Sequence, residues 1–209
     1  MPSMSKVLKK TVPKAKVSRK AQMVVAAEEL LRQRGLGGVT TRAIAEAVPC
    51  SEGAIYVHFK DKLDLFLAVL QASLPEMLTP LHALEKKVGM GTPRQNLGIA
   101  LAGLMRFHDR VTPMLCSLLM EPELLQRFRQ SLNASGKGPH RGIATLAHYI
   151  EREQQLGRIE THVDAKTAAS VLMAYSFFHT FTSKLLGSDG KADMKRLIDF
   201  VIQSSDARY

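Results

Sequence analysis

Residues 39–62 read VTTRAIAEAVPCSEGAIYVHFKDK, and this stretch predicts two short helices joined by a tight turn. The first helix ends at Pro49, because proline lacks the amide hydrogen that a helix interior needs. Ser51 is a favourable capping residue for the second helix. Ile55 and Phe59 lie four residues apart in that helix, so they share the face that points inward.

A longer helix precedes this pair, and another follows it. Ser18 can cap the preceding helix, and Gly35 can end it in the left-handed conformation. The first short helix starts at Thr40. The helix that follows the pair is capped by Asp61 and is expected to end or kink at Pro75. A helix followed by two short helices around a tight turn is typical of a DNA-binding unit whose last helix enters the major groove.

The outward residues of this unit are small or can form hydrogen bonds. Gly53 and Ala54 allow close approach to base edges, and Tyr56 and His58 can reach phosphate oxygens. Glu52 either accepts a hydrogen bond from a cytosine amino group or stabilises the helix N-terminus, and we favour the second role. The expected DNA-binding residues are Thr41, Arg42, Ser51, Glu52, Gly53, Ala54, Tyr56, His58 and Lys62.

The runs at 39–47 and 51–62 resemble the tetracycline-repressor (TetR/AcrR) family of bacterial regulators. The shared features are Thr-Thr-Arg, Ile-Ala, Ser-x-Gly, Ile-Tyr-x-His-Phe and a following Lys, all at the spacing of the family. The likeness covers about residues 18–70, and the rest of the chain matches only in outline. It implies a sequence-specific DNA-binding regulator.

The resemblance also implies roles for individual residues. Arg42 could reach a base, and positions 52–54 would face base edges. The family usually has glycine in the turn where this chain has Pro49, and proline cannot adopt the positive φ that is open to glycine. The turn must therefore be built differently. The residues that would hold phosphates are Thr41, Tyr56, His58 and Lys62.

The chain carries a formal net charge of +10, most of it near the N-terminus. Residues 1–62 hold 12 basic and 5 acidic side chains and so account for +7. This excess indicates a polyanionic partner, nucleic acid before a membrane surface. Residues 1–17 are expected to form a flexible basic arm that either binds phosphates or is a passive tail. Its candidate phosphate ligands are Lys9, Lys10, Lys14 and Lys16.

The remainder of the chain has the periodicity of helices, and no stretch alternates as a strand does. We expect Pro80 and Pro113 to interrupt helices. The expected fold is all-α, with about nine helices. It comprises a helix-turn-helix DNA-binding domain at 18–62, a connecting helix at 63–75 and a larger C-terminal ligand-binding and dimerisation domain at 76–209.

The helix expected at 165–186 is apolar on every side, so it is buried against the core on one face and against a partner on the other. The resemblance implies that this helix and the one at 191–204 pair with their copies in a four-helix homodimer interface. A dimer would present two recognition helices, ~34 Å apart, to the two halves of a palindromic operator.

Methionine and aromatic residues recur between residues 93 and 181 and can line a cavity for a small apolar or aromatic ligand. Ordinary core packing is the alternative for each of them, and it is the better interpretation of the two histidines. The expected function is a homodimeric repressor released by such a ligand. The alternative is a DNA-binding regulator controlled by a protein partner or by its own concentration. The candidate lining residues are Met105, Phe107, His108, Met114, Met120, Tyr149, Tyr175, Phe178 and His179.

The sequence lacks the residues that other classes of function need. No stretch reaches the ~18 to 20 uncharged apolar residues of a membrane span, so we expect a cytoplasmic protein. The 7 histidines and 2 cysteines are not at metal-ligand spacing, and no nucleophile elbow, P-loop or dinucleotide loop is found. We therefore expect no metal, no cofactor and no enzymatic activity. A further alternative is an enzyme or a helical interaction module that carries a DNA-binding unit of this type. Such a protein would show no salt-dependent binding to any duplex.

Overall fold

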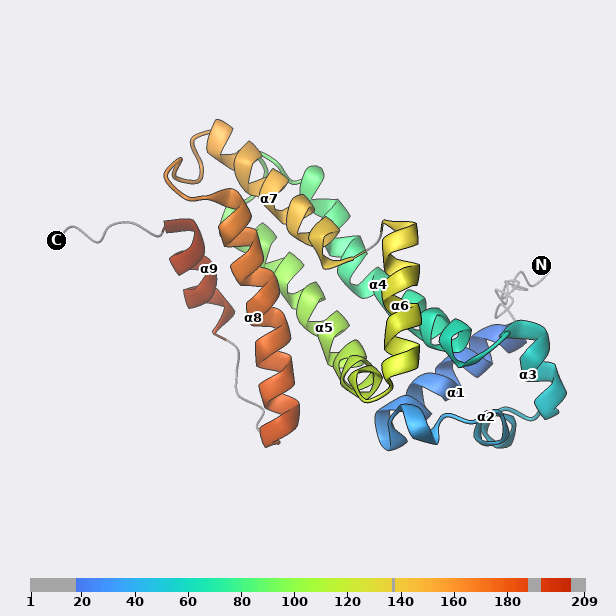
Figure 1. Cartoon of the computed structure of the whole chain (residues 1–209). Coiled ribbons are helices and arrows are strands. Elements are labelled where there is room, and N and C mark those ends of the chain that lie inside the picture. Colours follow the sequence, from blue (N-terminus) through green and yellow to red (C-terminus); the bar gives the residue numbers. More distant parts are fainter. Residues whose placement is uncertain (1–17, 137, 188–192, 204–209) are drawn as a thin grey trace, which may run out of the picture.

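The computed structural model describes residues 18–136, 138–187 and 193–203 of the chain. Within these ranges the chain is all-α, as predicted, with nine α-helices, a single 3₁₀ turn (Leu36–Gly38) and no strand (Figure 1). The four lysines predicted for the basic arm (Lys9, Lys10, Lys14 and Lys16) lie outside the described residues. The helices are α1 (Arg19–Arg34), α2 (Thr41–Ala47), α3 (Glu52–His58), α4 (Lys62–Glu85), α5 (Pro93–Leu119), α6 (Pro122–Ser135), α7 (Pro139–Gln155), α8 (Ala165–Leu186) and α9 (Met194–Gln203).

The first three helices form a compact group at one end of the molecule, from which α4 leads into a helical bundle (Figure 1). In the bundle, α5 packs against α4 and α8, and α7 packs against α4 and α8. The last helix, α9, lies against α5 and α8. We call α1–α3 the head and the remaining helices the body.

The first four helices begin at the residues that the sequence indicates. Ser18, Thr40, Ser51 and Asp61 each accept a hydrogen bond from the backbone amide three residues further on. A cap of this kind satisfies an amide that has no partner inside the helix and is worth ~1 kcal/mol. Gly35 ends α1 with φ 64°, a conformation that favours glycine.

The interruptions expected at Pro80 and Pro113 are wrong, and the helix does not end at Pro75. α4 continues through both Pro75 and Pro80, and α5 continues through Pro113. The reason for Pro80 lies in its neighbour, because a Cβ at Gly103 of α5 would collide with the Pro80 ring and with the Glu76 carbonyl oxygen. Glycine at 103 therefore leaves room for the proline, and the packing of α4 along α5 outweighs the lost helical hydrogen bond.

The buried side chains form two clusters. The head-side core joins α1–α3 and the first turns of α4 to residues of α5 and α6, among them Phe107, Met114 and Phe128. The body core joins the second half of α4 and the first half of α5 to α7, α8 and α9. Since α4 and α5 contribute to both clusters, the head-side core extends past the domain boundary that we expect near residue 62. In the described ranges, no helix has the length and apolarity of a membrane span.

Candidate nucleic-acid interface

The turn between α2 and α3 is built without any left-handed residue. Val48 ends α2 in an extended conformation (φ −120°, ψ 113°), and Ser51 is extended before α3 (φ −75°, ψ 152°). The Arg19 guanidinium donates a hydrogen bond from Nη1 to the Pro49 carbonyl oxygen at 2.6 Å. Pro49 therefore lies in a turn flanked by two extended residues, and Arg19 at the start of α1 holds its carbonyl oxygen.

The outward face of α3 is open to solvent. Ile55 and Phe59 point into the head-side core, as predicted. Tyr56 is 61% exposed, whereas Ala54 and His58 are partly buried. Nothing but the Ser51 hydroxyl comes within 4 Å of the position that a Cβ would take at Gly53, so a base edge can approach there.

Val57 is a candidate contact that the sequence interpretation missed. It is 80% exposed, in the middle of the same outward face. Its position could have been found, because Ile55 and Phe59 point inward and a residue midway between them lies on the opposite side of the helix. An exposed valine on a recognition helix can contact the methyl group of thymine.

Glu52 and Thr41 are paired with each other. The Thr41 hydroxyl donates a hydrogen bond to Glu52 Oε2 at 2.8 Å, which ties the first turn of α2 to the first turn of α3. The Glu52 carboxylate also lies at the N-terminus of α3, where a negative charge is favourable. This geometry favours the stabilising role of Glu52 over contact with a cytosine.

The two basic candidates are held only by partly exposed ion pairs. Arg42 Nε lies 3.1 Å from Glu46 Oε1 one helical turn away, and both side chains are largely exposed. Lys62 Nζ lies 3.6 Å from Glu121 Oε1, next to α6. Exposed pairs of this kind contribute little to stability, so either cation can exchange its carboxylate for a DNA phosphate or base.

The start of α4 is fixed against α6 by a second ion pair. Arg127 Nη2 lies 2.5 Å from Asp61 Oδ2, and this hydrogen bond is the main reason why the pKa of Asp61 is lowered. The same carboxylate caps α4 through the Asp64 amide. The cap of the helix that carries Lys62 is therefore also an anchor to the body.

The nine candidate residues of the ligand cavity lie in several parts of the described structure. Met120 is 82% exposed at the end of α5, and Phe178 is 63% exposed on α8. Phe107 and Met114 pack in the head-side core. These four residues face different parts of the molecule. Helical periodicity predicts which face of a helix is apolar, but it does not predict which neighbouring helix covers that face.

Tyr149 and His108 are core residues with satisfied polar groups. The Tyr149 hydroxyl oxygen accepts a hydrogen bond from the Asn96 amide at 2.9 Å, and burial raises the pKa of the phenol. His108 Nδ1 lies 2.9 Å from the Ser176 hydroxyl, which itself donates to the Met173 carbonyl oxygen. The imidazole is therefore the donor in the first bond, and burial lowers the pKa of His108 to about 4.

The other three candidates lie on α5 and α8. The rings of Tyr175 and His179 are 5.7 Å apart, and His179 borders a hollow together with Met105. This hollow, of ≈ 470 Å³, lies where α4, α5 and α8 meet, and most of the residues around it are charged or polar. The residues that line it are Glu76, Met105, Arg106, Asp109, Arg110, His179, Thr180 and Ser183.

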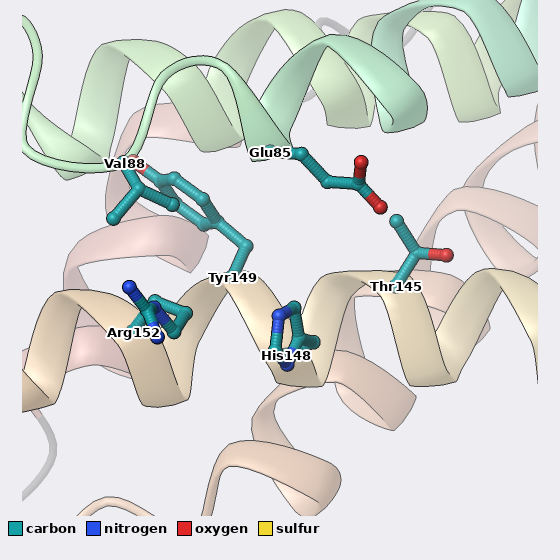
Figure 2. Close-up of a pocket in the computed structure, with 6 residues that line it drawn as sticks. All are labelled: Glu85, Val88, Thr145, His148, Tyr149 and Arg152. Atoms are coloured by element: carbon teal, nitrogen blue, oxygen red, sulfur yellow. The ribbon is translucent and has the colours of Figure 1, made fainter.

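A second hollow, of ≈ 390 Å³, lies between α7 and the end of α4 (Figure 2). In Figure 2, Tyr149 and Thr145 project from α7 toward Val88 and Glu85, and His148 and Arg152 lie on the same helix. Neither hollow has the predominantly apolar residues expected around an apolar ligand. Among the described residues, no group of three or more His, Cys, Asp or Glu side chains could hold a metal ion.

Comparison with known proteins gives consistent matches. Residues 24–69 match the sequence pattern of a family described as bacterial regulatory proteins, tetR family. The transcriptional repressor BepR of Brucella suis is 25% identical over 211 residues, covering 94% of this chain and 96% of BepR. The transcriptional regulator TtgR of Pseudomonas putida is 27% identical over 178 residues, covering 81% of each chain.

Solved structures share the fold. SmeT, the repressor of the Stenotrophomonas maltophilia multidrug efflux pump SmeDEF, matches with a TM-score of 0.61 and 20% identity, covering 91% of this chain and 92% of SmeT. The transcriptional regulator FadR of Bacillus subtilis, solved in complex with stearoyl-CoA, matches with a TM-score of 0.61 and 17% identity. That match covers 88% of this chain and 98% of FadR.

Proposed function

We propose that the chain, a DNA-binding transcriptional regulator similar to the tetR family of bacterial regulatory proteins, is a homodimeric repressor that a small molecule releases from a palindromic operator. The observation that carries the proposal is the capped helix α3, whose outward face is exposed and whose inward face is fixed in the head-side core. Such a repressor acts on the chromosome, in the cytoplasm.

In this proposal, α3 enters the major groove. Gly53 and Ala54 lie closest to the base edges, with Ser51 and Glu52 at the start of the helix, and Val57 adds an apolar contact. Phosphates are held by the residues that can reach them from the flanks, and Arg42 reaches a base after leaving Glu46. The proposed phosphate ligands are Thr41, Tyr56, His58 and Lys62, with the arm lysines as further ligands.

Exposed apolar side chains on the last two helices support the homodimer. Phe178, Leu185 and Leu186 of α8 are exposed, and Phe200 of α9 is 69% exposed. Large apolar side chains gathered on neighbouring helices are typical of a protein interface. We propose that a second copy covers them, as in a four-helix interface around a twofold axis.

Release by a small molecule is a separate part of the proposal. Two observations favour it: a hollow borders α4, the helix that leads from the head, and FadR of Bacillus subtilis binds stearoyl-CoA in the same fold. The alternative is a regulator without a small-molecule effector. In that case, a protein partner or the concentration of the regulator itself would control DNA binding.

Selection of bound duplexes from a random pool tests the proposal. We expect a palindromic sequence with half-sites about one helical turn apart, bound by a dimer. Lys62→Ala and Tyr56→Phe should weaken all duplexes about equally, whereas Arg42→Ala should weaken the preference at one base position by ~1–3 kcal/mol. Recovery of no preferred duplex, or of one bound by a monomer, would contradict the proposal.

A further inference from the structure

Arg110 of α5 joins α1 of the head to α4 and α5 of the body at one point. Its Nε and Nη2 donate hydrogen bonds to the two carboxylate oxygens of Glu28 in α1, at 2.7 and 2.5 Å. Its Nη1 donates to Glu76 Oε1 in α4 at 2.7 Å. We call these three side chains the Arg110 clasp. All three are partly buried, so solvent screens their charges less than at a free surface.

The two halves of the clasp have different geometry. Glu28 is held by two parallel hydrogen bonds, an arrangement that fixes direction as well as distance. Glu76 is held by one. The guanidinium therefore fixes α1 to α5 more firmly than it fixes α4, although Glu28 and Arg110 are 82 residues apart in sequence.

The clasp forms part of the wall of the hollow between α4, α5 and α8. Arg110 and Glu76 both line this hollow, and Arg106 brings a second guanidinium to it one helical turn away. Asp109 also lines it, but its carboxylate already pairs with Lys184 of α8 at 2.8 Å. The sulfur and carbon atoms of Met105 add an apolar part to the lining. These groups suit a ligand that has one anionic group and an apolar portion.

We propose that this hollow binds an organic carboxylate, which takes Arg110 from Glu28 and thereby changes the position of α1 against α5. The inference rests on the proposed function, since it names the chemical class of the effector and the residue that transmits its binding. A guanidinium has five N–H donors, and three of them are used on Glu28 and Glu76. Glu76 lines the hollow and Glu28 does not, so an anion that draws the guanidinium into the hollow draws it away from Glu28 and opens that pair.

The consequence for DNA binding follows from linkage. If an anion in the hollow and Glu28 compete for one guanidinium, then removing the Glu28 charge has the same effect as adding the anion. The two perturbations should therefore act in the same direction and should not add. For a repressor released by its effector, both lower the affinity for operator DNA.

The test uses full-length variants with a duplex selected as above, at one ionic strength. The probe is 4-phenylbutyrate. Its uncharged amide, 4-phenylbutyramide, controls for the apolar part, and sodium chloride controls for the general effect of salt on DNA binding. Glu28→Gln keeps the shape of the side chain and removes its charge. Glu29→Gln is the matched control, because Glu29 is the next residue and pairs with Arg32 on its own exposed helix face.

We expect 4-phenylbutyrate to weaken operator binding by the wild type and by Glu29→Gln about 5- to 150-fold, the usual range of allosteric coupling. Glu28→Gln should bind operator more weakly without the probe and should lose most of the response to it. The amide should have no effect on any of the three proteins.

Three outcomes would overturn the inference. In the first, the wild type responds to 4-phenylbutyrate no more than to its amide or to sodium chloride. In the second, Glu28→Gln responds as Glu29→Gln does. In the third, Glu28→Gln unfolds at a lower temperature but keeps the full response, which would make the clasp purely structural. If the wild type prefers no duplex at all, the proposed function itself fails, and this result is distinct from the other three.

Discussion

Protonation of the buried His108 ring is expected to destabilise the folded chain at mildly acidic pH. Burial lowers the pKa of His108 from its ordinary value of 6.5 to about 4. As the pH falls below 6.5, the unfolded chain takes up the proton first, so the stability present above pH 6.5 decreases until the pH reaches about 4. Between pH 7.5 and pH 5, this one group accounts for a loss of about 2 kcal/mol in the free energy of unfolding.

Urea unfolding followed by circular dichroism at pH 7.5 and pH 5 measures this loss. All samples need one protein concentration, because association shifts the apparent stability. His108→Asn retains a donor for the Ser176 hydroxyl but does not titrate, so its loss of stability between the two pH values should be about 2 kcal/mol smaller than that of the wild type. His82→Gln, at an exposed position of α4, should leave the loss unchanged.

The refuting result is a His108→Asn protein that loses as much stability on acidification as the wild type does. It would mean that burial does not lower the pKa of His108, for example because the protonated ring reaches solvent. If His108→Asn fails to fold, His108→Gln provides the same comparison, because only the difference between the two pH values is used.

Three further predictions concern recognition, assembly and packing. Val57→Ala should reduce the preference for thymine at one operator position by ~1 kcal/mol in a binding-energy matrix while leaving the affinity for unrelated duplexes unchanged, and an unaltered matrix would remove Val57 from the base-reading set. Phe178→Glu should give a monomer in analytical ultracentrifugation. The control, Val25→Glu, changes an exposed apolar residue of α1 and should stay dimeric. A dimeric Phe178→Glu protein would refute the proposed interface. Gly103→Ala should lower the free energy of unfolding by ~1–3 kcal/mol, because its methyl group meets Pro80. The control, Gly98→Ala, should be neutral or slightly stabilising, because the nearest atom outside its own helix would be 3.8 Å away. A Gly103→Ala protein as stable as the wild type would contradict the close approach of α4 and α5.

The head could be predicted from the sequence because its signals are local. Ser18, Ser51 and Asp61 each cap a helix through an amide only three residues away, so a short stretch contains both partners of the bond. The inward positions of Ile55 and Phe59 follow from helical spacing in the same way. The outward position of Val57 follows from that spacing too. The sequence interpretation left Val57 out because valine is usually a buried residue.

The body could not be predicted to the same depth because its decisive contacts are between distant residues. Pro80 is accommodated by Gly103, which lies on another helix. Glu28 and Arg110 are 82 residues apart, and no periodicity links them. The ligand candidates show the same limit, since Met114 and Tyr149 are both buried but belong to different clusters.

The division of the core explains why the head need not move independently of the body. Phe107 and Met114 of α5 and Phe128 of α6 complete the head-side core, so the helices that cover the head also belong to the bundle. α4 and α5 run on from this cluster into the body core. Packed cores respond to a change by shifting between discrete arrangements rather than by continuous deformation, so a displacement of α5 near Arg110 changes the seat of α1 directly. A regulator built in this way needs no separate hinge between its head and its body, because α4 and α5 contribute to both cores.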